Sequence, residues 1–174
     1  MQKERVAEAF RNYVDNVLRA SFHLTKSRTE AEDCTQEAFF RLLAQPDSMQ
    51  DSHIKPWLLR TVINLSKNYL RSARHRRTVS VSEVEQLAVF TSLIPEEERA
   101  FGAVMKLPEI YRVPLYLHFV EGYSVAETAD ILKINVNTVN SRIRRARQKL
   151  AKQLDPPMIL HRKDEIDYDS TETG

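Results

Sequence analysis

Residues 121–150 read EGYSVAETADILKINVNTVNSRIRRARQKL, a pattern that predicts two short helices separated by a tight turn. Ser124 and Glu127 have the spacing of a capping box, in which a hydroxyl and a carboxylate satisfy free amides at a helix start. The apolar residues of this first helix keep a period near 3.6; they are Val125, Ala129 and Leu132, with Ile131 alongside. The second helix, capped by Asn137 or Thr138, buries Val139, Ile143, Ala146 and Leu150. The stretch therefore predicts a helix-turn-helix.

The opposite face of the second helix is polar and basic, and it carries Asn140, Ser141, Arg144, Arg145 and Gln148. No acidic residue occurs between Asp130 and Asp155. In a helix-turn-helix the second helix lies in the major groove of DNA, where Arg reads guanine and Asn reads adenine. The alternative is a basic helix that is only solvated, but solvated faces usually mix both signs of charge.

The same stretch also carries a family resemblance. E-G-Y-S-V-A-E-T-A-D-I-L, followed by N-T-V-N-S-R-I-R-R-A-R-Q-K-L, resembles the C-terminal DNA-binding domain of bacterial sigma factors of the extracytoplasmic-function group. The resemblance implies binding of the upstream, minus-thirty-five, promoter element through Ser124, Asn137, Thr138, Asn140, Ser141, Arg142, Arg144 and Arg145. Two positions depart from the family pattern. Lys133 replaces a usual helix-ending glycine, and Asn140 replaces a frequent Lys or Arg, which leaves the preferred DNA sequence open.

Composition predicts an all-α protein, and the length suits one ordinary domain or two small ones; the family resemblance implies two small helical domains joined by a linker. The 174 residues include only three glycines, and no strand periodicity is evident. The formal net charge of +2 averages basic stretches with acidic ones, so its distribution is more informative than its sum. The single cysteine, Cys34, allows no intramolecular disulfide. With no apolar run of membrane-spanning length and no signal-peptide core, we expect a cytoplasmic protein.

In the N-terminal half, residues 5–22 keep a helical apolar period, and a capping box at Ser27 and Glu30, or Thr29 and Glu32, opens a second helix that ends before Pro46. Its outer face shows Glu30, Asp33, Gln36, Glu37 and Arg41. A solvated face, a divalent-metal site and a protein-binding face are the three interpretations. Hard-metal sites need further oxygen ligands held in a cavity, and no second carboxylate helix is evident.

The resemblance favours the protein-binding interpretation. A-E-D-C-T-Q-E-A-F-F-R-L is similar to the segment with which sigma factors grip the clamp helices of the RNA polymerase beta-prime subunit. The implied contact residues are Asp33, Gln36, Glu37, Phe40 and Arg41. Core RNA polymerase is therefore an expected partner, together with promoter DNA.

A polar loop is predicted from Gln45 to His53, and Pro56 suits the first turn of a third helix, with Trp57 as a core anchor. The segment W-L-L-R-T-V-I-N-L-S-K-N-Y-L-R again resembles these sigma factors. The resemblance implies that this helix recognises and opens the downstream, minus-ten, element through Asn64, Lys67, Asn68, Arg71 and Arg74. It makes the loop 47–53 a candidate for holding a base extruded from the stack. The alternative for Arg74 to Arg77 is a generic basic helix end.

Residues 78–95 are expected to form the linker between a first domain, 1–77, and a second domain, 96–154. In the second domain, helices are expected to start at Pro95 and after Pro108. The tail, 155–174, is acidic and expected to be flexible. A sharper hypothesis lets Asp164 to Asp169 fold back on Arg142 to Arg147 as a DNA mimic.

Together these observations predict a promoter-specificity subunit that performs no covalent chemistry and needs no cofactor, metal or small-molecule substrate. The family adds the expectation of an inhibitory anti-sigma factor, for which membrane anchoring is one option. The alternatives are an autonomous helix-turn-helix regulator acting without core polymerase, a metal-dependent nuclease using Glu30, Asp33 and Glu37, and a degenerate member that binds only other proteins.

Overall fold

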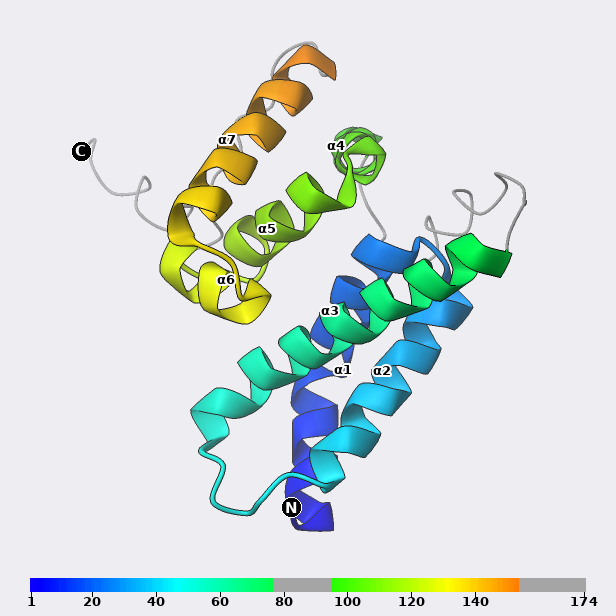
Figure 1. Cartoon of the computed structure of the whole chain (residues 1–174), viewed down its shortest axis with the longest axis vertical. Coiled ribbons are helices and arrows are strands. Elements are labelled where there is room, and N and C mark those ends of the chain that lie inside the picture. The colour runs from blue at the N-terminus through cyan, green and yellow to red at the C-terminus, as the bar shows by residue number, and fades with distance from the viewer. Residues whose placement is uncertain (77–94, 154–174) are drawn as a thin grey trace, which may run out of the picture. The chain divides into compact units, whose positions relative to one another are not determined.

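The computed structural model describes residues 1–76 and 95–153, and all regular structure in these ranges is helical (Figure 1). The helices are α1 (Lys3–Thr25), α2 (Arg28–Leu43), α3 (Asp51–Arg76), α4 (Pro95–Lys106), α5 (Glu109–Phe119), α6 (Val125–Leu132) and α7 (Val136–Gln153). The chain divides into two compact units, Met1–Ser92 and Leu93–Gly174. The predicted all-α fold with two helical domains is confirmed. The predicted tail and nearly all of the predicted linker lie outside the described residues.

The N-terminal unit consists of α1, α2 and α3, which run antiparallel in succession (Figure 1). Its fully buried side chains come from all three helices and include Val17, Leu42, Leu58, Leu59, Val62 and Ile63. One polar pair joins α1 to α3 inside this core, because the hydroxyls of Ser21 and Ser66 lie 2.8 Å apart. Burial raises the pKa of the nearby Cys34 thiol, which keeps this side chain protonated and poorly reactive.

Four details of this unit differ from the sequence-based predictions. Ser27 stands at the N-cap of α2, but its side chain makes no capping hydrogen bond. Helix α3 begins at Asp51 and not near Pro56, so the last three residues of the predicted loop 45–53 are helical. Trp57 is only partly buried, and the neighbouring leucines fill the core in its place. Phe10, predicted on the buried stripe of α1, is 45% exposed.

The C-terminal unit contains α4 to α7 and packs through two small clusters. The first consists of Ala103, Leu107, Leu115, Ala146 and Leu150, and the second of Ala129, Val139 and Ile143. The predicted buried stripe of α7 is confirmed in full. In α6 the buried stripe is shifted: Thr128, Ala129 and Ile131 are buried, whereas Leu132 is only partly covered.

A buried arginine stabilises the corner between α4 and α5. Arg112 is 2% exposed, and its Nη1 donates to the carbonyl oxygens of Met105, at 2.9 Å, and Leu107. These carbonyls lie where α4 ends, and helix-terminal carbonyls lack intrahelical partners. Burial lowers the pKa of Arg112 to about 10, against a smaller opposing effect of Glu109. The guanidinium therefore stays charged at neutral pH and acts as a cap for α4.

Candidate nucleic-acid and polymerase interfaces

The first helix of the helix-turn-helix is capped as predicted. Ser124 Oγ accepts a hydrogen bond from the Glu127 amide at 3.2 Å, and Glu127 Oε2 accepts one from the Ser124 amide at 2.8 Å. At the other end Lys133 adopts the left-handed conformation, with φ 53°, and its amide donates to Ala129 O. Lys133 thus takes the conformation for which glycine is usually selected.

The cap of α7 is Asn135, and the prediction of Asn137 or Thr138 is wrong. Asn135 Oδ1 accepts from the Asn137 amide at 2.8 Å, and Asn135 O accepts from the amides of Thr138 and Val139. An asparagine side chain two residues before an amide is well placed for this bond. The helix therefore starts earlier, and Asn137 and Thr138 belong to its first turn.

The predicted DNA-reading residues of α7 differ in exposure. Asn137, Asn140, Arg144 and Arg145 are exposed, while Thr138, Ser141 and Arg142 are partly buried. The Ser141 hydroxyl donates to Thr138 O at 2.9 Å, so its hydrogen is engaged by the helix backbone. Val136, which the sequence analysis did not select, is 43% exposed and lies four residues before Asn140, on the same ridge.

Some basic residues of α7 lie over aromatic rings of α5, and some line an open depression; Lys149 does both. The Arg147 guanidinium lies 6.0 Å from the centre of the Phe119 ring, and the Lys149 amine 5.8 Å from that of Tyr111. These are cation–π contacts with α5. Arg145, Gln148, Lys149 and Lys152 line an open depression along the helix. Since α7 carries no acidic residue, this surface is suited to contact phosphates.

On α2 the residues predicted to bind polymerase share one outward face. Asp33, Gln36 and Arg41 are exposed and Glu37 is partly buried, and Arg41 Nε donates to Glu37 Oε1 at 2.6 Å. Phe40 is 69% exposed, whereas its neighbour Phe39 is buried in an edge-to-face contact with Phe10 at 5.0 Å. The face therefore combines charged groups with one large exposed aromatic ring.

The carboxylates of α2 do not assemble a metal site. The Tyr69 hydroxyl of α3 donates to Glu30, and Glu37 is paired with Arg41. Among the side chains that the structure describes, in residues 1–72 and 100–153, no group of three His, Cys, Asp or Glu is placed to hold a metal ion. The geometry gives the nuclease hypothesis no support.

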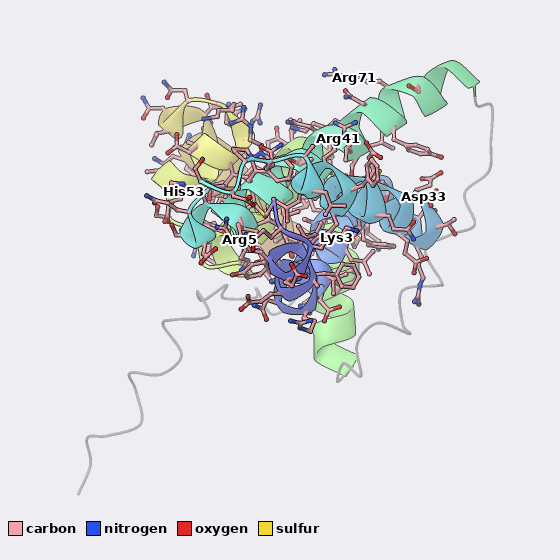
Figure 2. The ribbon with its side chains drawn as sticks, turned by 90° about the horizontal axis from the view of Figure 1, so that it is seen from below. Lys3, Arg5, Asp33, Arg41, His53 and Arg71 are labelled. Carbon is pink, nitrogen blue, oxygen red and sulfur yellow. The ribbon has the colours of Figure 1, made fainter. Side chains whose placement is uncertain are left out.

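On α3 the predicted minus-ten residues follow one face at spacings of three and four. Asn64, Asn68 and Arg71 are exposed and Lys67 is partly buried. Arg74 belongs to α3, but its side chain lies outside the described residues. Figure 2 shows Arg71 toward the end of α3 that is remote from His53 in the first turn.

The structure also reveals a residue that sequence reasoning missed. Arg5 of α1 contacts Asp47, Met49 and Asp51, where the chain passes from α2 to α3. Its partners lie 42 to 46 residues away in sequence, so no local pattern could have indicated them.

None of the helices in the described ranges has the length and hydropathy to cross a bilayer.

The fold and these surfaces define a class: an all-helical, two-unit DNA-binding protein with a helix-turn-helix in its C-terminal unit. Comparison with known families narrows it. Residues 9–76 match Sigma-70 region 2, and residues 98–150 match Sigma-70, region 4. The chain is 32% identical over 143 residues to the ECF RNA polymerase sigma-E factor of Escherichia coli (strain K12), which covers 73% of this chain and 75% of that protein.

Two further comparisons agree. The ECF RNA polymerase sigma factor SigM of Bacillus subtilis (strain 168) is 28% identical over 152 residues, covering 83% of this chain and 92% of that protein. The sigma factor RpoE of Bartonella quintana, solved with the anti-sigma factor NepR, shares the fold with a TM-score of 0.70 at 21% identity, covering 87% of this chain and 98% of that one. The chain belongs to the extracytoplasmic-function sigma factors of the sigma-70 family. It is thus a promoter-specificity subunit of RNA polymerase, and sigma factors are transcription initiation subunits that are not known as enzymes.

Proposed function

We propose that the two units divide promoter recognition between them. Residues 1–77 bind core RNA polymerase and recognise and melt the minus-ten element, residues 96–154 bind the minus-thirty-five element, and residues 78–95 connect them, with 155–174 as an acidic tail. The two family matches support this division, because each falls within a different proposed domain. Both elements lie on one promoter, so a single chain can engage them together.

The observation that carries the proposal is the exposed ridge of α7. Asn140, Arg144 and Arg145 are exposed on a helix that follows a capped turn and carries no acid. A helix with these side chains can place an amide on adenine and guanidinium groups on guanine or phosphate. Asn137 and Val136 extend this surface toward the start of α7, where helix-turn-helix proteins contact base edges.

For core polymerase we propose docking through the outer face of α2. Phe40 supplies exposed apolar area next to the charged side chains of Glu37 and Arg41. Large aromatic side chains of this kind dominate the binding energy of protein interfaces, with charges around them setting orientation. Asp33, Gln36, Glu37 and Arg41 would provide those charges and polar groups to the beta-prime clamp helices.

For the minus-ten element we propose the face of α3 that carries Asn64, Lys67, Asn68, Arg71 and Arg74, together with the loop 47–53. Amides and cations at helical spacing suit a strand whose phosphates must be followed while its bases are unstacked. This segment runs into the first turn of α3 and would hold one extruded base. No covalent step, cofactor, metal ion or small-molecule substrate enters the proposal.

We also propose an anti-sigma partner and a cytoplasmic location. The structure of the similar protein RpoE contains the anti-sigma factor NepR. A protein that covers the exposed face of α2, Phe40 included, would block polymerase binding in the resting cell. Whether such a partner is membrane-anchored would decide how an external signal reaches it.

The test is run-off transcription with purified core polymerase on a pool of promoter fragments from the host, with and without the full chain, followed by sequencing of transcript starts. We expect starts at a few defined positions only when the protein is present, with two shared upstream elements. DNA binding without transcript starts would favour the autonomous regulator instead.

Two variants separate the proposed surfaces. Phe40→Ala should weaken binding to core polymerase and leave binding of the upstream element unchanged, while Arg144→Ala should do the reverse. Arg28→Ala is the control on α2, because Arg28 lies on the same helix in an exposed ion pair with Glu32, a pair type that contributes little. Equal loss in both assays for either variant would contradict the division of labour.

A further inference from the structure

Arg5 connects α1 to the segment between α2 and α3 through its whole guanidinium group. Nε and Nη2 donate to Asp51 Oδ1 at 2.8 and 2.5 Å, Nη1 donates to Asp47 O at 2.8 Å, and Nη2 also donates to Met49 O. The Arg5 side chain is only 24% exposed. Figure 2 shows Arg5 and His53 at the same end of the N-terminal unit.

The acceptors belong to Asp47, Met49 and Asp51, at the α3 end of the segment that joins α2 to α3. Two of them are backbone carbonyls, those of Asp47 and Met49, and the third is a carboxylate in the first turn of α3. The amide of Gln2 adds a bond to Asp47 Oδ1 at 2.8 Å. Within the segment itself, two backbone turns bond Met49 N to Pro46 O and His53 N to Gln50 O. The start of α1 is therefore a major support of the loop.

This geometry differs from an ordinary surface ion pair. The Asp51 side chain is 84% exposed, so its charge interaction with Arg5 is screened by water and contributes little on its own. The backbone carbonyls of Asp47 and Met49 have fixed directions, and a planar guanidinium with donors in a rigid fork can satisfy several acceptors together. The main effect of the Arg5 contacts is therefore to fix the conformation of the loop, and their electrostatic contribution to stability is small.

We propose that Arg5 is a positioning residue for recognition of the minus-ten element. It holds residues 47–51 of the loop 47–53 in one conformation before DNA arrives. Exposed groups of this loop, such as Ser48, Gln50 and His53, then meet an extruded base without an ordering cost. Preorganised groups discriminate better than groups that must be ordered on binding. This inference rests on the proposed role of the loop in the minus-ten element.

The test uses run-off transcription by the full chain and core polymerase on a promoter pool that is randomised across the downstream element. Sequencing of the transcripts gives the base preference at each position. With Arg5→Ala we expect the preference at one or two adjacent positions to fall by about tenfold, the discrimination that one good base contact provides. Preferences at the remaining positions and in the upstream element should persist.

Three further variants separate positioning from charge and from unfolding. Arg5→Lys keeps the charge without the fork and should lose most of the same preference. Asp51→Ala leaves both carbonyl contacts and should lose little of it. Arg11→Ala, an exposed arginine on the same helix, should lose none. Hydrogen exchange of Arg5→Ala should speed up at the amides of the loop and stay slow in the interiors of α2 and α3.

Three results would overturn the inference, and they differ. If the wild-type chain shows base preferences in the downstream element and Arg5→Ala keeps them all, Arg5 does not position the loop. If the wild-type chain itself shows no preference at any position there, the proposed base-holding role of the loop fails and the inference fails with it. A uniform loss across both elements, with fast exchange throughout α1 to α3, would identify Arg5 as a stability residue only.

Discussion

The two units hold their proposed DNA-facing segments in different ways. In the N-terminal unit the loop before α3 is fixed by Arg5, whose partners lie 42 to 46 residues away. In the C-terminal unit the helix-turn-helix is fixed by bonds across two or three residues, at Ser124 with Glu127 and at Asn135 with Asn137. The first arrangement depends on tertiary packing, while the second forms within the segment itself.

This difference has a consequence for function. A segment supported by local caps keeps its shape whenever its two helices form, which suits a rigid reader of duplex DNA. A loop that is held by groups from the start of α1 keeps its shape only while α1 packs in place, and this support preorganises it for an unstacked base. The comparison predicts that single substitutions disturb one unit and leave the other intact.

The largest effect is expected at Arg112, where the C-terminal unit depends on a buried charge. Arg112→Ala removes the donor to two carbonyls at the end of α4 and should lower the free energy of unfolding of this unit by about 2–4 kcal/mol. Chemical denaturation of the full chain, with hydrogen exchange to assign the loss, measures it. Lys106→Ala, at an exposed position in the last turn of α4, is the control.

The pH dependence of this effect has a definite sign. Burial lowers the folded-state pKa of Arg112 from its ordinary value to about 10, so the unfolded chain binds more protons than the folded one only between about pH 10 and the ordinary pKa of arginine. The cost of burying the charge is fully present at neutral pH and is relieved as the pH rises through about 10. The stability deficit of Arg112→Ala should therefore stay constant around neutral pH.

If Arg112→Ala also loses hydrogen-exchange protection in α1 to α3, the independence of the two units is contradicted.

A second prediction compares two arginines on α7. Arg145 lines the open depression, whereas Arg147 lies over the Phe119 ring. Arg145→Ala should weaken binding of the upstream element by about 1–3 kcal/mol if it reads a base, or reduce the salt dependence by about one counterion if it contacts a phosphate. Arg147→Ala should lower stability by about 0.5–1 kcal/mol with a smaller effect on DNA. Titration of a promoter duplex at several salt concentrations distinguishes them, and a larger binding loss for Arg147 would reverse the assignment.

The same contrast explains what could be predicted from the sequence. The helices, the buried stripe of α7 and the Ser124 cap depend on residues three or four apart, so periodicity and spacing determine them. Near misses arose where neighbouring residues offer equivalent chemistry. Asn135 and Asn137 can both cap a helix, and in a helix as short as α6 the buried stripe can include Ile131 or Leu132.

Other features could not be predicted, because tertiary packing selects among residues that look alike in sequence. Phe10 keeps the helical apolar period of residues 5–22 and yet is 45% exposed. The partners of Arg5 are backbone carbonyls, which have no sequence signature. The position of Arg147 was easier to predict from the sequence. Arg147 follows Ala146 and lies four residues after Ile143, and both of these residues are buried, which predicts a side chain near the core.

A third prediction tests the local cap of the helix-turn-helix. Ser124→Ala removes the acceptor for the Glu127 amide and should lower stability by about 1 kcal/mol. Ser124 is also proposed to contact DNA. DNA binding, measured at a temperature where the wild-type protein and Ser124→Ala are both folded, separates the two roles. Ser124→Asp, which can still cap the helix but repels phosphate, should retain stability and lose affinity. If both variants bind DNA normally, Ser124 acts only as a cap.

The smallest effect gives the closest comparison, because each unit contains one lysine in the left-handed conformation. Lys26 follows α1 with φ 58°, and Lys133 follows α6 with φ 53°. Glycine avoids the steric cost of this conformation, about 1–2 kcal/mol, but loses more entropy on folding. The free energy of unfolding should therefore rise by about 0.5 kcal/mol in each of Lys26→Gly and Lys133→Gly.

Gly122→Ala is the control, for which the free energy of unfolding should fall. Gly122 has φ 78° and nothing within 4 Å of an added Cβ, so its loss would come from the backbone alone. If Lys133→Gly stabilises the C-terminal unit and Lys26→Gly does not stabilise the N-terminal one, the Lys26 side chain contributes to its unit by contacts that offset the strain, and the dependence of that unit on side-chain contacts extends beyond Arg5.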